Sequence, residues 1–191
     1  MPEIQNLSFS YPERELFTDL SAAIKPGVTL VRGGDGRGKT TLLRLLAGEL
    51  KPSSGHLQTN AKVFWIDPRT EAFDQLTGTE FFESQRAVFP EFDDALVNTL
   101  VDGLDLADHI HKRLYMLSTG TKRKVYVAAA FASGAAVTLI DMPFAAVDKP
   151  SMDFILGLLQ DAADSAGRAF VVADYAAPAG VRLAGVIDLG N

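Results

Sequence analysis

The stretch that decides the fold is VTLVRGGDGRGKTT, residues 28–41. Its first five residues are mostly apolar or β-branched and predict a buried strand, and the next eight, residues 33–40, match the pattern G-x-x-x-x-G-K-[ST] at every position. Because glycine has no Cβ, the backbone N–H groups of such a loop can turn inward and close on phosphate oxygens. Leucines at helical spacing from 40 to 50 predict the helix that should follow. We therefore predict a phosphate-binding loop (P-loop) between a strand and a helix.

Several side chains of this loop have predicted roles. Lys39 is expected to bridge the β- and γ-phosphates of a nucleotide, and the Thr40 hydroxyl to bind Mg²⁺. A helix that begins near Gly38 adds its positive end and its unpaired N–H groups. The predicted nucleotide-binding residues here are Gly33, Gly34, Asp35, Gly36, Gly38, Lys39, Thr40 and Thr41. Since kinases and GTPases share this loop, it predicts a nucleotide ligand but no particular reaction.

Composition and charge narrow the remaining possibilities. The 191 residues, 47% hydrophobic and 22% charged, indicate a single globular domain over 1–191, and the lack of cysteine rules out a disulfide framework. A net charge of −6 argues against a nucleic-acid partner, which would require a basic surface. The uncharged stretch 125–140 is too short to cross a bilayer. We expect a cytoplasmic protein without a secretory signal, linked to a membrane only through a partner.

Apolar, β-branched segments alternate with helical patterns along the chain. Strands are predicted at 4–9, 16–24, 28–32, 56–58, 62–66, 136–140, 169–173 and 186–189. Helices are predicted at 40–50, 77–88, 93–104, 121–131 and 151–166. This order predicts an α/β fold with its ligand site at the carboxyl ends of the strands. Residues 68–116, rich in acidic residues and phenylalanine, are interpreted as a helical subdomain inserted into this core.

Beyond the P-loop, nearly the whole chain resembles the ATP-binding subunits of ABC transporters, and its length is similar to that of the compact subunits of haem exporters. The segment LSFSYP, 7–12, is similar to the family's first strand. The resemblance implies a P-loop core of ABC-ATPase type with a small antiparallel β-subdomain, and it implies that Tyr11 stacks on adenine.

Two later segments strengthen the resemblance. LSTGT, 117–121, resembles the LSGGQ signature, which implies an anion site for the γ-phosphate held by a facing subunit, made by Ser118, Thr119, Gly120 and Thr121. VTLID, 137–141, resembles the Walker B strand and implies that Asp141 is a ligand of Mg²⁺. The D-loop with Asp148 follows at the family's spacing. The basic residues 122–124 lie at the start of the predicted signature helix, and we expect them to help bind phosphate.

Four positions depart from the family's pattern, and the resemblance implies that these positions serve ATP hydrolysis. Met142 follows Asp141 where the family has the glutamate that polarises the attacking water. Asp67 stands at the Q-loop position. Asp174, or Tyr175 if the register shifts by one, replaces the switch histidine. The signature has threonine in place of its first glycine and its glutamine.

These departures leave two interpretations of the site. In one, it binds ATP but hydrolyses it slowly or not at all. In the other, Asp67 or Asp174 takes over the catalytic role, although a carboxylate about 4 Å from a phosphate charge meets a repulsion of about 4 kcal/mol at an effective dielectric constant near 20. A carboxylate beside Mg²⁺ avoids that repulsion. Asp67 is therefore predicted as a metal or water ligand beside Thr40 and Asp141, and Asp174 is the second catalytic candidate.

The resemblance implies an ATP-binding subunit of an ABC transporter, with ATP and Mg²⁺ as cofactors. It would pair with a second nucleotide-binding subunit, as a homodimer or heterodimer, and drive a transmembrane permease from the inner face of the membrane. The main alternative is a non-transport, hydrolysis-deficient ATP-sensing or scaffold protein on the same fold. A P-loop kinase is a third possibility, and the signature-like segment counts against it.

Overall fold

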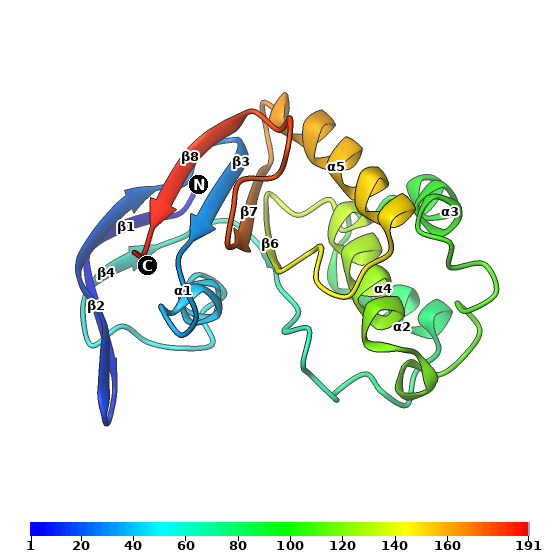
Figure 1. The fold of residues 1–191 in the computed structure, drawn as a ribbon, viewed down its shortest axis with the longest axis horizontal. Helices are drawn as coiled ribbons and strands as arrows, with labels where there is room; N and C mark the ends of the chain where they lie inside the picture. Colours follow the sequence, from blue (N-terminus) through cyan, green and yellow to red (C-terminus); the bar gives the residue numbers. More distant parts are fainter. Residues whose placement is uncertain (191) are drawn as a thin grey trace.

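The computed structural model describes residues 1–190, and a five-stranded sheet in the order β5-β6-β7-β3-β8 forms its centre (Figure 1). The strands are β3 (Gly27–Arg32), β5 (Val63–Phe64), β6 (Val137–Asp141), β7 (Ala169–Asp174) and β8 (Leu183–Asp188). All neighbours pair in parallel. Each strand of β3, β6 and β7 is buried along almost its whole length, as expected of a parallel sheet covered on both faces. The predicted α/β P-loop fold is confirmed.

The strand order determines where the site lies. β7 separates β3 from β6, so the loop after β3 and the last residue of β6 come out at the same carboxyl edge of the sheet. In open parallel sheets, ligands bind at this edge. Residues 33–41 and Asp141, about a hundred residues apart in the sequence, therefore become neighbours.

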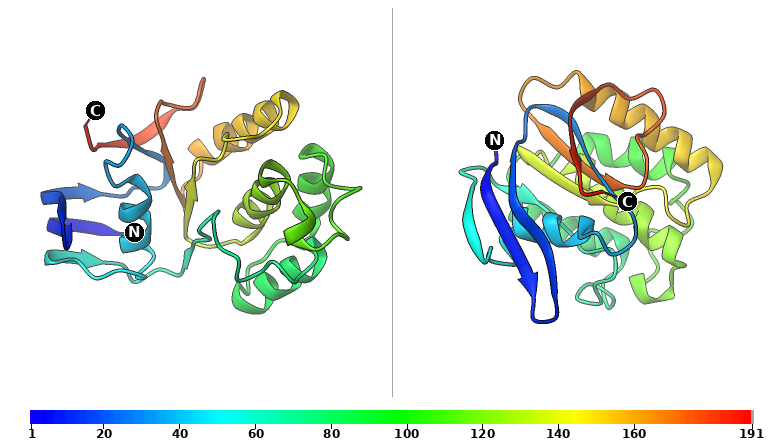
Figure 2. Two further views of the ribbon diagram at one scale, coloured as in Figure 1. Left: turned by 60° about the horizontal axis from the view of Figure 1, so that its bottom comes forward. Right: turned by 60° about the vertical axis from the view of Figure 1, so that its left-hand side comes forward.

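A second, antiparallel sheet has the order β2-β1-β4, built from β1 (Glu3–Tyr11), β2 (Arg14–Ala23) and β4 (Ser54–Gln58). Helix α1 (Lys39–Leu46) lies between this sheet and the parallel one (Figures 1 and 2). Its leucines pack with Phe9 and Phe17 of the antiparallel sheet and with Leu139 and Val171 of the parallel sheet. The predicted small antiparallel β-subdomain is thus confirmed.

Helix α1 ends at Leu46, four residues before the predicted end at Leu50. Ala47 is the C-cap residue, and Gly48 has a positive φ of 78°. A glycine in the left-handed conformation ends a helix because it turns the chain away while its neighbours still bond the last carbonyls. The leucine spacing continues past this point, but the backbone does not follow it.

Four helices lie on the other side of the parallel sheet, opposite α1 in Figure 2, and the last two of them contact its strands. These are α2 (Gly78–Val88), α3 (Asp94–Gly103), α4 (Thr119–Ala132) and α5 (Lys149–Ala163). Side chains that alternate with those facing α1, such as Ile140, Phe170 and Val172, pack into this second core. The predicted helices in 68–116 thus appear as α2 and α3, while their status as an inserted subdomain stays a prediction. None of the helices within residues 1–190 has the length and hydropathy of a membrane span.

Candidate functional site

The loop between β3 and α1 is held closed by its own lysine. The Lys39 ammonium donates hydrogen bonds to the carbonyl oxygens of Gly33, at 2.7 Å, and Gly34, at 3.0 Å. Gly38 has a φ of +94°, and a Cβ at this position would lie 2.7 Å from Cζ of Phe17. Glycine is therefore required at position 38 both by its backbone conformation and by the aromatic ring packed against it.

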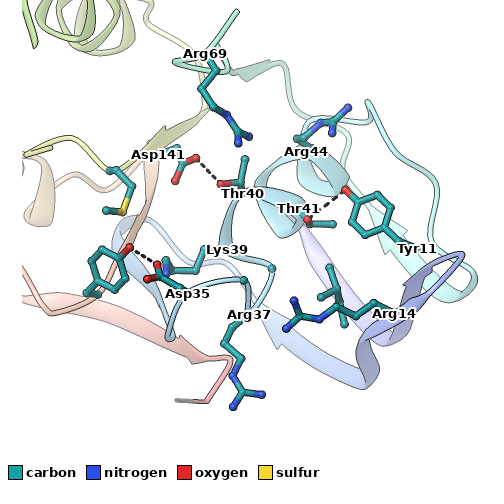
Figure 3. Close-up of a pocket in the computed structure, with 15 residues that line it drawn as sticks. Tyr11, Arg14, Asp35, Arg37, Lys39, Thr40, Thr41, Arg44, Arg69 and Asp141 are labelled. Atoms are coloured by element: carbon teal, nitrogen blue, oxygen red, sulfur yellow. Dashed lines mark hydrogen bonds between the residues drawn. The ribbon is translucent and has the colours of Figure 1, made fainter. Parts of the chain in front are cut away.

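The loop lines a cleft of about 550 Å³, which Figure 3 shows from close by. A volume of this size falls in the usual range for small-ligand pockets. The lining residues are Tyr11, Arg14, Leu16, Asp35, Gly36, Arg37, Gly38, Lys39, Thr40, Thr41, Arg44, Arg69, Asp141, Met142 and Tyr175. The structure thus gathers Tyr11, most of the predicted loop residues and Asp141 in one place. The positive side chains on its walls suit a polyanionic ligand.

Thr40 and Asp141 meet at the floor of this cleft. The Thr40 hydroxyl donates to Oδ2 of Asp141 at 2.6 Å (Figure 3). Burial raises the pKa of Asp141, which is only 8% exposed, although the hydrogen bond from Thr40 opposes the shift. A buried carboxylate next to a hydroxyl gives hard oxygen donors and an uncompensated charge, and this combination fits Mg²⁺. No cluster of three or more potential metal-binding side chains occurs in residues 1–190, so bound phosphates and waters would have to complete the coordination.

Tyr11 forms the far wall of the cleft, at the end of β1. Its hydroxyl lies 3.4 Å from Oγ1 of Thr41, and its ring packs edge-on against Phe9 with 5.0 Å between centroids. The side chain remains 40% exposed. A ring that is fixed at one edge and open to solvent offers a face on which a base can stack. The predicted contact with adenine stays a prediction.

Of the two residues considered for the switch position, Tyr175 reaches the cleft. Its hydroxyl donates to the Asp35 carboxylate, and its ring centroid lies 4.1 Å from the Lys39 ammonium. The Asp174 carboxylate instead accepts the backbone N–H of Tyr175 at 2.7 Å and lines a separate hollow beside Phe144. Burial raises the pKa of Asp174. Tyr175 is therefore the one of the two that contacts the P-loop, and the assignment of the switch position stays a prediction.

Asp67 is near the cleft but is not among its lining residues. Its carboxylate accepts the backbone N–H of Arg69 at 2.9 Å and the Arg69 guanidinium at 3.3 Å, and the arginine itself lines the cleft. The negative charge of Asp67 helps to raise the pKa of Asp141, because the two carboxylates repel each other. Its role as a metal or water ligand stays a prediction, and it would require Arg69 to release the carboxylate.

The signature segment lies at the start of α4, outside the cleft. Ser118 is the N-cap residue, and its Oγ accepts the backbone N–H of Thr121 at 3.1 Å. Ser118 and Thr119 are exposed, whereas Gly120 is buried. The four signature residues therefore cannot contact a ligand of this chain's own P-loop in the present arrangement. Ser118 and Thr119 present a polar helix N-terminus to solvent.

Gly120→Ala is expected to destabilise the fold. A Cβ at Gly120 would lie 2.0 Å from the carbonyl oxygen of Ala146, a backbone atom that cannot move without shifting the D-loop. Such overpacking costs about 2 kcal/mol, so the melting temperature should fall by about 4–8 °C in calorimetry. The control is Gly157→Ala, where a Cβ meets nothing within 4 Å and a helical alanine should add stability. Equal melting temperatures for both variants would contradict the packing argument.

The D-loop aspartate is a structural partner of the signature helix. Asp148 caps α5 by accepting the backbone N–H of Ser151 at 2.9 Å, and it pairs with the buried Lys124 ammonium at 3.0 Å. These two hydrogen bonds, the first being the stronger cause, hold the pKa of Asp148 well below its usual range. The charge of Asp148 therefore stabilises the folded state whenever it is ionised.

Asp148→Asn is expected to lower the melting temperature at pH 7 by about 2–4 °C, because asparagine keeps the cap but leaves Lys124 without a counter-charge. Since the folded pKa is lowered, this stabilisation is fully present above the unfolded value, near 3.9, and is lost as the pH falls below it. The difference between variant and wild type should therefore close in acid. Asp153→Asn, which removes only an exposed pair with Lys149, is the control. A pH-independent difference would show that charge is not the cause.

The basic run 122–124 differs most from expectation, because each of its side chains bonds within the protein instead of pointing towards a phosphate. Lys122 pairs with Asp74, and Lys124 with Asp148. The Arg123 guanidinium donates to the carbonyl oxygens of Asp141, at 3.1 Å, and Met142, at 2.5 Å. Sequence reasoning missed the role of Arg123. Nothing in the sequence distinguishes this arginine from the two lysines beside it.

Comparison with known proteins agrees with this site. A family model described as "ABC transporter" matches residues 17–145. The cytochrome c biogenesis ATP-binding export protein CcmA of Pseudomonas savastanoi is 30% identical, with 93% of this chain and 90% of that protein covered. The ATP-binding cassette sub-family A member 17 of mouse is also 30% identical, over 78% of this chain, but the match spans only 10% of the mouse protein.

Among solved structures, an ATP-binding cassette determined as a dimer in a post-hydrolysis state bound to ADP and Pi has a TM-score of 0.78 to this chain. It is 19% identical, with 92% of this chain and 88% of that one covered. At this identity the likeness shows the fold alone.

Proposed function

The chain belongs to the ABC transporter family as an ATP-binding subunit, and from this premise we propose that it couples the binding of MgATP to the movement of a transmembrane partner. The observation that carries the proposal is the pair formed by Thr40 and Asp141 at 2.6 Å beside the P-loop, in the same cleft. Burying the Asp141 carboxylate without a counter-ion is unfavourable for folding. The contact is therefore not explained by the stability of the fold. The pair makes sense as part of a site for a metal-bound triphosphate.

Binding of ATP would rearrange the loop around Lys39. In the present structure its ammonium is engaged by two loop carbonyls and by the face of Tyr175. A triphosphate offers charged oxygens that form stronger hydrogen bonds with an ammonium than carbonyls do. We expect Lys39 to transfer to the β- and γ-phosphates, with adenine against Tyr11. Thr40 and Asp141 would hold Mg²⁺, which supplies positive charge to the phosphates when bound.

The proposed partner is a second nucleotide-binding subunit. The exposed start of α4, with Ser118 and Thr119, lies outside this chain's own cleft and therefore suits a nucleotide held by a facing subunit. Two copies, or this chain and a sister, would enclose ATP between P-loop and signature. Closure on binding and opening on release would move a permease, which we place against the helical subdomain 68–116 on the cytoplasmic side of the membrane.

Turnover is proposed to be slow, because the cleft holds Met142 where a general base is expected. A thioether cannot take a proton from water. If hydrolysis occurs, Asp67 is the first candidate to orient the water and Asp174 the second. The same observation favours the alternative function, an ATP-sensing or scaffold protein that binds ATP without transport.

The test that separates the two functions is an ATPase assay with and without the membrane protein encoded beside this chain. A transporter subunit should be stimulated several-fold by that protein reconstituted in lipid vesicles. A sensor should bind ATP tightly, have no such neighbour and show no turnover above background. The second outcome would reject the transporter assignment while leaving ATP binding in place.

A further inference from the structure

A small hollow lies beneath the Walker B strand, between β6 and the signature helix α4. Its volume is about 20 Å³, and it is distinct from the nucleotide cleft, with only Asp141 lining both. Most of its wall is apolar, from residues such as Phe64, Val127 and Ile140. A space of this size accommodates one water molecule.

Three polar atoms with no hydrogen-bond partner belong to residues that line this hollow. They are Nε of Arg123, the hydroxyl of Tyr126 and Oδ1 of Asp141. Tyr126 is 5% exposed and Asp141 is 8% exposed. Within residues 1–190 only one other buried side-chain atom, Oγ1 of Thr29 in β3, shares this condition. Leaving a buried polar group unpaired is unfavourable, so three such groups in residues that line one hollow call for a common partner.

We propose that this hollow binds one structural water, which links Arg123 and Tyr126 of the signature helix to the Walker B carboxylate. The donors and acceptors balance: Nε–H of Arg123 donates to the water, the water donates to Oδ1 of Asp141, and the Tyr126 hydroxyl makes the third bond in either direction. Three hydrogen bonds are typical of a buried water. All three unpaired atoms are then satisfied at once.

Arg123 also forms hydrogen bonds with the backbone beside the Asp141 carboxylate. Nη1 of Arg123 donates to the carbonyl oxygens of Asp141 and Met142, and Met142 has a positive φ of 52°. Side chain and main chain of the Walker B end are thus fixed from one point on α4, while Oδ2 of Asp141 faces Thr40 in the cleft. Arg123 is therefore a positioning residue for the metal-binding carboxylate. This conclusion rests on the proposed function, whereas the water itself does not.

A high-resolution crystal structure of the nucleotide-free chain tests the water directly. The expected result is ordered density about 3 Å from all three atoms. An empty hollow, a different partner for Nε of Arg123, or an Asp141 carboxylate with both oxygens turned into the cleft would overturn the inference. None of these outcomes bears on whether the chain binds ATP.

If Arg123 positions the metal-binding carboxylate, its loss should weaken ATP binding only when Mg²⁺ is present. A purely structural role would weaken binding equally with and without Mg²⁺. Arg123→Gln should weaken ATP binding by about tenfold in the presence of Mg²⁺, which corresponds to one charge-assisted hydrogen bond, and by less than about twofold in EDTA. Equal losses in both conditions would refute the role. If Arg123→Gln does not fold, Tyr126→Phe provides a second test. Tyr126→Phe should lower the melting temperature by about 2–4 °C, whereas Tyr115→Phe, at an exposed position, should leave it unchanged. Equal melting temperatures would refute the water bridge.

Discussion

Replacing Lys39 with alanine should reduce the affinity for MgATP by about 100-fold, since the variant loses the only ammonium that lines the cleft. In the present structure this ammonium already lies within the loop, bonded to the Gly33 and Gly34 carbonyls. Those carbonyls can turn to water in the variant, whereas the phosphates lose a charged partner that binds them more strongly than water does. The affinity is measured by calorimetric titration of the purified chain.

The control for this experiment is Lys51→Ala, which removes an exposed lysine beyond α1 with the same change in net charge. Its affinity should stay within about twofold of the wild type, because charges separated by more than about 10 Å of solvent are largely screened at 0.1 M salt. An equal loss in both variants would mean that overall charge, and not the P-loop lysine, governs binding. An unchanged affinity in Lys39→Ala would contradict the assignment of the loop.

Replacing Met142 with glutamate should raise the rate of ATP hydrolysis by at least about 100-fold, the smallest contribution usual for a positioned general base. Met142 lines the cleft directly after Asp141, so a carboxylate there would face the phosphates. The backbone at this position, with φ of 52°, already carries a side chain larger than that of alanine, so glutamate adds no new backbone strain. Phosphate release under single-turnover conditions measures the effect.

Met142→Gln is the matched control, because glutamine has the same shape but cannot accept a proton at neutral pH. It should leave the rate at the wild-type level. Asp67→Asn completes the set. If Met142→Glu is no faster than wild type while Asp67→Asn is inactive, the acid at the Q-loop position performs the catalytic role, and the interpretation of a missing base is wrong.

The P-loop and the Walker B strand were predictable because their signals are local. A glycine-rich turn between a strand and a helix, and an uninterrupted apolar strand ending in Asp141, each specify their own backbone. Parallel pairing then brings them together, since β3 and β6 both flank β7. Strand alternation alone could not decide between Asp174 and Tyr175, because the chain leaves β7 at that residue and its direction depends on the loop that follows.

The partners of the basic run 122–124 could not be predicted, since they depend on tertiary contacts between distant segments. Lys122 meets Asp74 of the segment before α2, and Arg123 meets carbonyls at the end of β6. Nothing in the sequence near α4 marks those positions as neighbours. Charge alone suggested a phosphate, whereas the fold uses the same charges to bind the helix to three neighbouring segments: the one before α2, the end of β6 and the start of α5.

The proposed function depends above all on the binding of a triphosphate by the P-loop, and titration calorimetry of the purified chain with ATP in magnesium buffer tests this most directly. We predict saturable heat with a dissociation constant below about 1 mM, lost in Lys39→Ala and retained in Lys51→Ala. The absence of heat from ATP and ADP at millimolar concentrations, with a folded protein in the cell, would contradict it.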